Sequence, residues 1–331
     1  MDITPLSSQG HRTPLPNWSQ QAVDANKQII IVHQGALGDF LMIWPALASL
    51  RTSLPATSLF WAGSSARLPL LRPLHIAYAS PSMVRTVRML HLGDPDKIRL
   101  DAKVLLLWFS LRKKPALIKG ENIFFLHGMT QGVLRPPWSV FAQSLTQLGV
   151  PFDSHWQARF QAGFPRHMDP GEKTILLFPG SGNPAKNWPL VQFLELAAWL
   201  HEQGWNPVMV LGPVEQEKGL ALPDTMARAC PETIEELIAL LQGAAFVVGN
   251  DSGPMHLAGY MGIPGLSIFG PTSPAQWGPL GMDILSLDLV CSPCTQTARI
   301  SCPDPACIRN ITLDQVTARL RPALVRLSQT P

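Results

Sequence analysis

The chain has 331 residues, which suits two domains better than one, and its composition of 46% hydrophobic and 15% charged residues excludes a disordered protein. Its net charge of +3 conceals a division, because residues 1–150 hold 15 Lys/Arg against 7 Asp/Glu whereas residues 151–331 hold 11 against 16. Two halves of opposite sign indicate two domains with different partners, and the lack of helix-turn-helix or zinc-finger spacing argues against nucleic acid as one of them.

The first segment, 1–27, is polar and contains proline, without the apolar core of a secretory signal. No apolar run in the sequence reaches the roughly 18 residues that a membrane-spanning helix needs. We therefore expect a flexible N-terminal arm and a cytoplasmic location.

The first half then alternates strand and helix patterns. The apolar run 29–32 predicts a buried strand, and a helical pattern continues to about Arg51, with Pro45 inside it as a kink or as the helix's proper start. The remaining elements expected in this half are strands at 58–61, 104–109 and 122–126 and a helix around 140–148. A cluster of basic residues here is either a solvated face or an anion-facing patch: Arg112, Lys113, Lys114 and Lys119.

A stretch rich in Pro, Gly and charge, 163–171, is interpreted as a linker, after which the same alternation resumes. We expect strands at 174–178, 207–211, 245–248 and 266–269, and helices at 190–203, 234–241, 255–260 and 312–327. This alternation predicts two α/β, Rossmann-like domains with parallel sheets that face a cleft.

The loops that follow the strands are the expected ligand positions, since open α/β sheets bind ligands beyond the carboxyl ends of their strands. The first loop contains Gly35 and Gly38, which let backbone pass close to a ligand, and then Asp39. The spacing differs from the dinucleotide-binding fingerprint, and Asp39 is either a helix cap or a functional carboxylate.

The second loop, 179–189, has the donors that a phosphate prefers: small residues, the hydroxyl of Ser181, Gly182 and the cation of Lys186. The alternative is a solvated turn with a surface lysine. A third loop leads into a predicted helix and contains Asp251, Ser252, Gly253 and His256. These residues are either ligand contacts or have structural roles: Asp251 and Ser252 as simple helix caps, and His256 as a core residue. Two further loops contain candidate ligand contacts. Thr272 follows the strand at 266–269, and Glu215 and Glu217 follow the strand at 207–211.

Four of the five cysteines are close in sequence, with the spacing C-x2-C-x7-C-x4-C: Cys291, Cys294, Cys302 and Cys307. The first pair has the spacing of metal ligands, and four thiolates could close a tetrahedral zinc site. Reduced packing thiols are the favoured alternative, because the x7 and x4 gaps are irregular compared with those of standard zinc ribbons.

Together these segments resemble glycosyltransferase family 9, the bacterial ADP-heptose:lipopolysaccharide heptosyltransferases. The resemblance runs from about Gln28 to Leu320, and its most specific part is Asp251-Ser252-Gly253-Pro254-Met255-His256 followed by Ala258 and Gly270-Pro271-Thr272. It implies the GT-B architecture, with an acceptor-binding domain over 28–165 and a nucleotide-sugar-binding domain over 172–311. A C-terminal helix over 312–331 could pack back towards the N-terminal domain.

The resemblance also implies roles for individual residues. Asp39 is similar to the catalytic base, with Gly35 and Gly38 in the loop on the acceptor side, and Ser181 and Lys186 resemble diphosphate contacts. Asp251 resembles a group that positions the sugar, and the other donor-site positions are Gly182, Ser252, Gly253, His256 and Thr272. The nucleotide-holding glutamate is left open between Glu215 and Glu217, because Gln216 occupies the expected place.

The implied function is inverting, metal-independent transfer of a heptose from ADP-heptose to an anionic lipid A-linked core saccharide at the inner face of the membrane. No cofactor is expected, and the enzyme could be peripheral on that membrane. Two alternatives remain open: another nucleotide sugar or glycan acceptor on the same fold, and a non-catalytic nucleotide-sugar binder. The sequence gives no indication of the oligomeric state.

Overall fold

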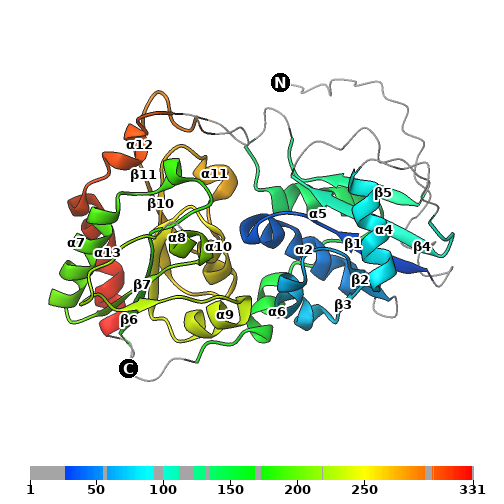
Figure 1. The fold of residues 1–331 in the computed structure, drawn as a ribbon, viewed down its shortest axis with the longest axis horizontal. Helices are drawn as coiled ribbons and strands as arrows, with labels where there is room; N and C mark the ends of the chain where they lie inside the picture. The colour runs from blue at the N-terminus through cyan, green and yellow to red at the C-terminus, as the bar shows by residue number, and fades with distance from the viewer. Residues whose placement is uncertain are drawn as a thin grey trace, which may run out of the picture.

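The computed structural model describes residues 27–54, 58–92, 100–111, 122–130, 134–167, 173–217, 219–294, 300 and 302–329. The expected N-terminal arm, apart from Lys27, and the basic cluster over 112–119 lie outside these residues. The described chain forms two α/β lobes, each built on a parallel sheet (Figure 1). Within the described residues, no helix has both the length and the apolar character needed to cross a bilayer.

The N-terminal lobe has a five-stranded parallel sheet in the order β3-β2-β1-β4-β5. Its strands are β1 (Gln28–Val32), β2 (Leu59–Trp61), β3 (Ala77–Tyr78), β4 (Val104–Ser110) and β5 (Ile123–His127). Its helices are α2 (Leu37–Ser53), η1 (Ser65–Arg67), α3 (Leu68–Leu71), η2 (Arg72–Leu74), α4 (Pro81–Leu92), α5 (Pro137–Gln147) and α6 (Trp156–Gly163). β1 lies at the centre, and its apolar run is buried because helices cover both faces of a parallel sheet.

Helix α2 runs unbroken through Pro45, so Pro45 does not mark its start. A proline at this position has no N–H to donate to the carbonyl four residues earlier, that of Leu41. The hydroxyl of Tyr260, in the other lobe, donates to Leu41 O at 3.0 Å. The missing backbone bond is therefore replaced by one that joins the two lobes.

The C-terminal lobe has a six-stranded parallel sheet in the order β11-β10-β9-β6-β7-β8. Its strands are β6 (Thr174–Phe178), β7 (Asn206–Val210), β8 (Arg228–Ala229), β9 (Phe246–Asn250), β10 (Gly265–Phe269) and β11 (Asp283–Ser286). Its helices are η4 (Pro184–Lys186), α7 (Leu190–Glu202), α8 (Pro213–Glu217), α9 (Ile234–Gln242), α10 (Gly253–Tyr260), α11 (Pro274–Trp277), α12 (Ala306–Arg309) and α13 (Leu313–Ser328).

The final helix, α13, begins at a capping box in which Thr312 and Gln315 satisfy each other's backbone N–H groups. The sequence suggested that this helix could pack back towards the N-terminal domain, and the structure shows a different packing. Its apolar face joins the core of the C-terminal lobe and lies beside α7 (Figure 1). The reason is that Val316 and Leu320 pack with Trp188, whose indole N–H also donates to Ile311 O at 2.8 Å.

The two lobes share a continuous apolar core, to which the unexpected helix α6 contributes. The ring of Phe160, on α6, lies 4.7 Å from that of Trp44 on α2 and 5.4 Å from that of Tyr260 on α10, measured between centroids. Aromatic pairs at such distances stabilise a core beyond their buried area. The loops at the carboxyl ends of both sheets are thereby held next to each other.

Candidate functional site

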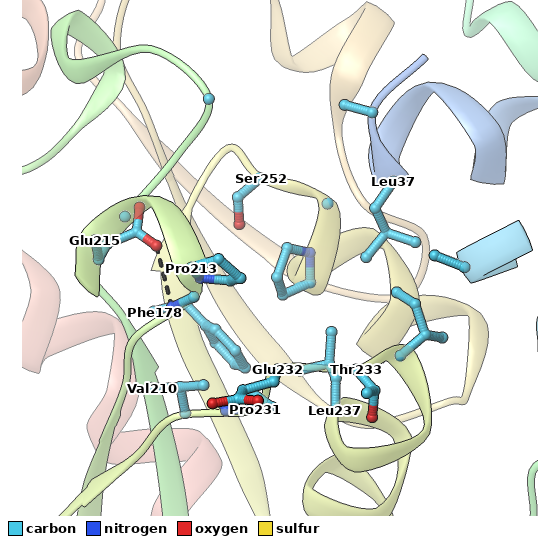
Figure 2. Close-up of a pocket in the computed structure, with 18 of the residues that line it drawn as sticks. Leu37, Phe178, Val210, Pro213, Glu215, Pro231, Glu232, Thr233, Leu237 and Ser252 are labelled. Atoms are coloured by element: carbon cyan, nitrogen blue, oxygen red, sulfur yellow. Dashed lines mark hydrogen bonds between the residues drawn. The ribbon is translucent and has the colours of Figure 1, made fainter. Parts of the chain in front are cut away.

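A cavity of about 530 Å³ lies between the lobes, at the carboxyl ends of the strands. Figure 2 shows Ser252 and Glu215 above, and Val210, Pro231 and Leu237 below. The N-terminal lobe supplies part of the wall: Ala36, Leu37, Ala66 and Arg67. The cavity is therefore lined by both polar and apolar side chains and by residues of both lobes.

Gly253 lets the first turns of α2 and α10 meet beside this cavity. A Cβ at Gly253 would lie 3.0 Å from Gly38 N and from Leu37 Cβ, closer than nearly all such contacts in proteins. Glycine at this position allows the backbones to approach. Asp39, in the first turn of α2, is consequently carried on a turn that contacts the loop containing Asp251.

Asp251 is the centre of a buried network behind the cavity wall. Its Oδ2 accepts hydrogen bonds from Lys186 Nζ at 3.0 Å and from Thr272 Oγ1 at 2.7 Å. Lys186 Nζ also donates to the backbone carbonyl of Asp251 at 2.9 Å. Because the Asp251 side chain is only 7% exposed, these bonds compensate a carboxylate that water hardly reaches. Asp251 is therefore not a simple helix cap.

His256 lies under this network, with Nε2 4.0 Å from Asp251 Oδ1. Burial lowers the pKa of His256 to about 4; Asp251 opposes that shift and Lys186 adds to it. At neutral pH the ring is therefore uncharged. Its Cδ2 lies 3.6 Å from the position of a Cβ at Gly38, so the ring also packs against the start of α2.

Ser252 occupies the N-cap position of α10, but its side chain makes no capping hydrogen bond. Its hydroxyl is buried, lines the cavity and has no hydrogen-bond partner among the described residues. Ser181 lines the same cavity, with Oγ 2.5 Å from Asn187 Oδ1. A buried hydroxyl without a partner costs stability unless a ligand or water satisfies it, and the ligand contact expected at Ser252 stays a prediction.

Glu215 lines the cavity, and its Oε2 accepts a hydrogen bond from Gly212 N at 3.1 Å (Figure 2). A side chain at Gly180 would collide with the Glu215 carboxylate, so the glycine leaves room for it. Glu217 is exposed and does not line the cavity. The structure thus separates the two glutamates that the sequence left as alternatives.

A second cavity, of about 470 Å³, lies in the N-terminal lobe and is lined by His33, Gly35, Arg67 and Arg88 among others. Arg67 lines both cavities. Burial lowers the pKa of Arg67, while the neighbouring Asp39 carboxylate acts in the opposite direction. Its Nε is buried and has no hydrogen-bond partner among the described residues. The region between the two cavities therefore has a cationic side chain beside Asp39.

The sequence profile of glycosyltransferase family 9 (heptosyltransferase) matches residues 135–304, just over half of the chain. The chain belongs to glycosyltransferase family 9. It is 36% identical over 122 residues to lipooligosaccharide heptosyltransferase 2 of Haemophilus influenzae, a match that covers 33% of this chain and 35% of the relative. It is 33% identical over 132 residues to lipopolysaccharide heptosyltransferase 1 of Pseudomonas aeruginosa, which covers 38% of this chain and 37% of the relative. These matches thus span little more than a third of either relative's length.

The fold of this family 9 chain is similar to the solved structure of Escherichia coli ADP-heptose lps heptosyltransferase II. The TM-score is 0.62 at 18% sequence identity, and the match covers 91% of this chain and 99% of the other. This likeness extends over both lobes. It confirms the GT-B architecture of two parallel-sheet domains that the sequence predicted.

The structure divides the predicted site residues of this family 9 member into three groups. Those that line the main cavity are Ser181, Gly182, Glu215, Ser252 and Gly253. Those that form the network behind its wall are Lys186, Asp251, His256 and Thr272. Those at or beside the start of α2 are Gly35, Gly38 and Asp39, of which Gly35 lines the second cavity. What each does for a ligand stays a prediction.

Two parts of the site were missed from the sequence. Arg67 lies on η1, after β2, and no sequence motif includes it. Residues between Pro231 and Leu237 also line the cavity, and this segment contains a recognisable signal, the sequence pattern of a capping box: Thr233 accepts from Glu236 N at the start of α9, although the Glu236 carboxylate accepts from Glu232 N. Helix starts beyond a parallel sheet are ligand positions, so this box could have been included.

The cysteine cluster is away from both cavities. Cys307 is buried, the other three thiols are exposed, and all four are free. Burial and the neighbouring cysteines raise the pKa of Cys294 and Cys307. Within the described part of the chain, no group of three or more His, Cys, Asp or Glu side chains is arranged to hold a metal ion.

Proposed function

We propose that this protein transfers a heptose from ADP-heptose to a lipopolysaccharide core acceptor, with inversion at the anomeric carbon. The single observation that carries the proposal is the main cavity, which is lined by polar and apolar side chains and lies between the two lobes of a family 9 chain. The similar structure from Escherichia coli is an ADP-heptose lps heptosyltransferase, which supports the choice of donor.

The main cavity suits a nucleoside diphosphate. Phe178, Val210 and Leu237 offer apolar surface to a base, and the Glu215 carboxylate can accept hydrogen bonds from ribose hydroxyls. The diphosphate would lie near the free hydroxyl of Ser252 and the first turn of α10, where backbone N–H groups are available.

Lys186 supplies positive charge on the same side of the site. Its ammonium group has three N–H donors, and Asp251 uses two of them. The remaining donor can reach towards a phosphate oxygen and stabilise the charge that develops as the nucleoside diphosphate departs. Lys186 and the backbone donors would thereby neutralise the leaving group without a metal ion or another cofactor.

Asp39 is the proposed general base. It stands in the first turn of α2, where the helix dipole favours a carboxylate, and close enough to Arg67, which lines both cavities, for the two charges to interact. The acceptor hydroxyl loses its proton to Asp39 as its oxygen attacks the anomeric carbon from the face opposite the diphosphate. Direct displacement of this kind inverts the anomeric centre.

The second cavity is the proposed acceptor site. Arg67 and Arg88 give it positive charge, and they would attract an anionic core saccharide. Because such an acceptor is linked to lipid A, the protein would work peripherally at the inner face of the membrane.

The test combines donor binding with turnover. ADP-heptose should raise the unfolding temperature, because a ligand that binds only the native state stabilises it, and heptose should appear on a lipopolysaccharide core acceptor that lacks it. Stabilisation by GDP- or UDP-sugars alone would assign a different donor. Binding of ADP-heptose without any transfer would instead indicate a nucleotide-sugar binder and contradict the proposed activity.

A further inference from the structure

Helices α2 and α10 carry the two sides of the proposed reaction centre. Asp39, the proposed base, lies in the first turn of α2, and the loop with Asp251 and Ser252 leads into α10. The two helices belong to different lobes and lie against each other (Figure 1). The position of the base relative to the donor loop therefore depends on what holds α2 against α10.

One contact joins the starts of the two helices. A Cβ at Gly253 would lie only 3.0 Å from Gly38 N, so the backbones approach closely there. The ring of His256, on the next part of α10, also packs against Gly38. A contact confined to one place leaves a helix free to tilt about it, so the direction of α2 needs a second point of attachment.

Tyr260, the last residue of α10, provides that second point. Its hydroxyl donates to Leu41 O at 3.0 Å, about one turn further along α2 than Gly38. Burial raises the pKa of Tyr260, so the hydroxyl keeps its proton and acts as the donor. Leu41 O is available because Pro45, four residues later in the same helix, has no N–H.

The ring of Tyr260 is itself held by aromatic packing. Its centroid lies 4.7 Å from that of Trp156 and 5.4 Å from that of Phe160, both on α6. Tyr260 is only 1% exposed. The hydroxyl therefore has a fixed position from which to hold α2.

We propose that Tyr260 is a positioning residue: its hydrogen bond to Leu41 O fixes the direction of α2 and so holds Asp39 towards the donor loop. This inference rests on the proposed function. Leu41 follows Asp39 by two residues in an unbroken helix, so a tilt at Leu41 also moves the carboxylate. A displacement on the order of 1 Å at a reacting group can lower a rate about a hundredfold. Tyr260 lines neither cavity, and it acts only through α2.

A double-mutant cycle separates positioning from stability. Tyr260→Phe removes the hydroxyl and keeps the ring. Pro45→Ala gives α2 an N–H that can donate to Leu41 O within the helix, but this bond does not join the lobes. The four proteins of the cycle are compared by urea unfolding, by calorimetric titration with ADP and by heptose transfer to a lipopolysaccharide core acceptor.

Stability and turnover should respond differently. Tyr260→Phe alone leaves the Leu41 carbonyl buried without its partner and should lower the urea midpoint, whereas in the Pro45→Ala protein the same change should lower it much less. We expect Tyr260→Phe to lower kcat roughly tenfold in both backgrounds, with ADP affinity unchanged. Pro45→Ala alone keeps the bond between the lobes and should retain wild-type kcat.

The matched control is Tyr78→Phe, which removes the hydroxyl of the other of the chain's two tyrosines. That hydroxyl donates to Gly63 O within the N-terminal lobe and should be dispensable for turnover. Two results would overturn the inference: wild-type kcat in Tyr260→Phe, or a loss of kcat that disappears together with the loss of stability when Pro45→Ala is added. The second would make the bond only structural.

Failure of the wild-type protein to transfer heptose would contradict the proposed function itself, and with it the base that Tyr260 positions. A wild-type protein that transfers heptose while the Tyr260 variants behave as in the overturning results contradicts only the role of Tyr260. The two failures are therefore distinguishable.

Discussion

Replacement of Lys186 by alanine should affect stability and ligand binding separately. The Lys186 side chain is 18% exposed and donates one hydrogen bond to the nearly buried Asp251 carboxylate and one to the Asp251 backbone carbonyl. Without it, Asp251 keeps the bond from Thr272, and the neighbouring His256 is too weakly basic to replace the cation at neutral pH. Loss of one partner from a buried ion pair costs about 3–5 kcal/mol, and the partial exposure of Lys186 places the expected loss near the lower figure.

The second effect concerns the diphosphate. A hydrogen bond between charged groups contributes about 1.5–3 kcal/mol, so ADP affinity should fall roughly tenfold to a hundredfold. Lys186→Ala combined with Asp251→Asn removes the buried charge and should recover most of the stability while ADP affinity stays low. Urea unfolding measures the first effect and calorimetric titration with ADP the second. Unchanged stability in the single variant would refute the network, and unchanged ADP affinity would refute the diphosphate contact.

Three further predictions concern the same wall of the cavity. Thr272→Val should lower the free energy of unfolding by about 1–2 kcal/mol, because it removes a buried 2.7 Å hydrogen bond to Asp251, whereas Thr272→Ser should not; equal values in urea unfolding would contradict this. Between pH 6.5 and about 4 the unfolded chain takes up a proton that native His256 does not. As the pH is lowered through this range, the free energy of unfolding should therefore decrease by up to about 3 kcal/mol from this residue. His256→Gln should flatten that dependence in denaturant titrations at pH 7 and 5, and identical slopes would show that another group is responsible. Glu215→Gln should weaken ADP binding and Glu217→Gln should not, and a titration that ranks them in the opposite order would reverse the assignment.

Most of the fold follows from local sequence patterns. Continuous apolar runs such as Ile29–Val32 and Thr174–Phe178 predicted the central strands, because strands buried on both faces need no alternation. Helix α2 continues through Pro45, and the carbonyl that the proline leaves free is satisfied by Tyr260, more than two hundred residues later, which no local pattern predicts. Helix α6 was missed because its buried residues Trp156 and Phe160 are too few to give a helical period.

Local sequence patterns also predicted part of the candidate site. Loops after strands identified Ser181 and Ser252, whose positions depend only on the order of strand, turn and helix. Arg67 could not be found in this way, because its place in the main cavity depends on how the lobes meet. The network of Lys186 and Thr272 with Asp251 also required tertiary structure, since these residues come from three separate loops.

The central claim is that Asp39 accepts the proton of the acceptor hydroxyl while the other lobe holds the donor, and Asp39→Asn tests it most directly. Asparagine keeps the size of the side chain but removes the negative charge. The account predicts that heptose transfer falls by at least about a hundredfold while calorimetric titration gives wild-type ADP affinity. Transfer at a rate close to wild type in the Asp39→Asn protein would contradict it.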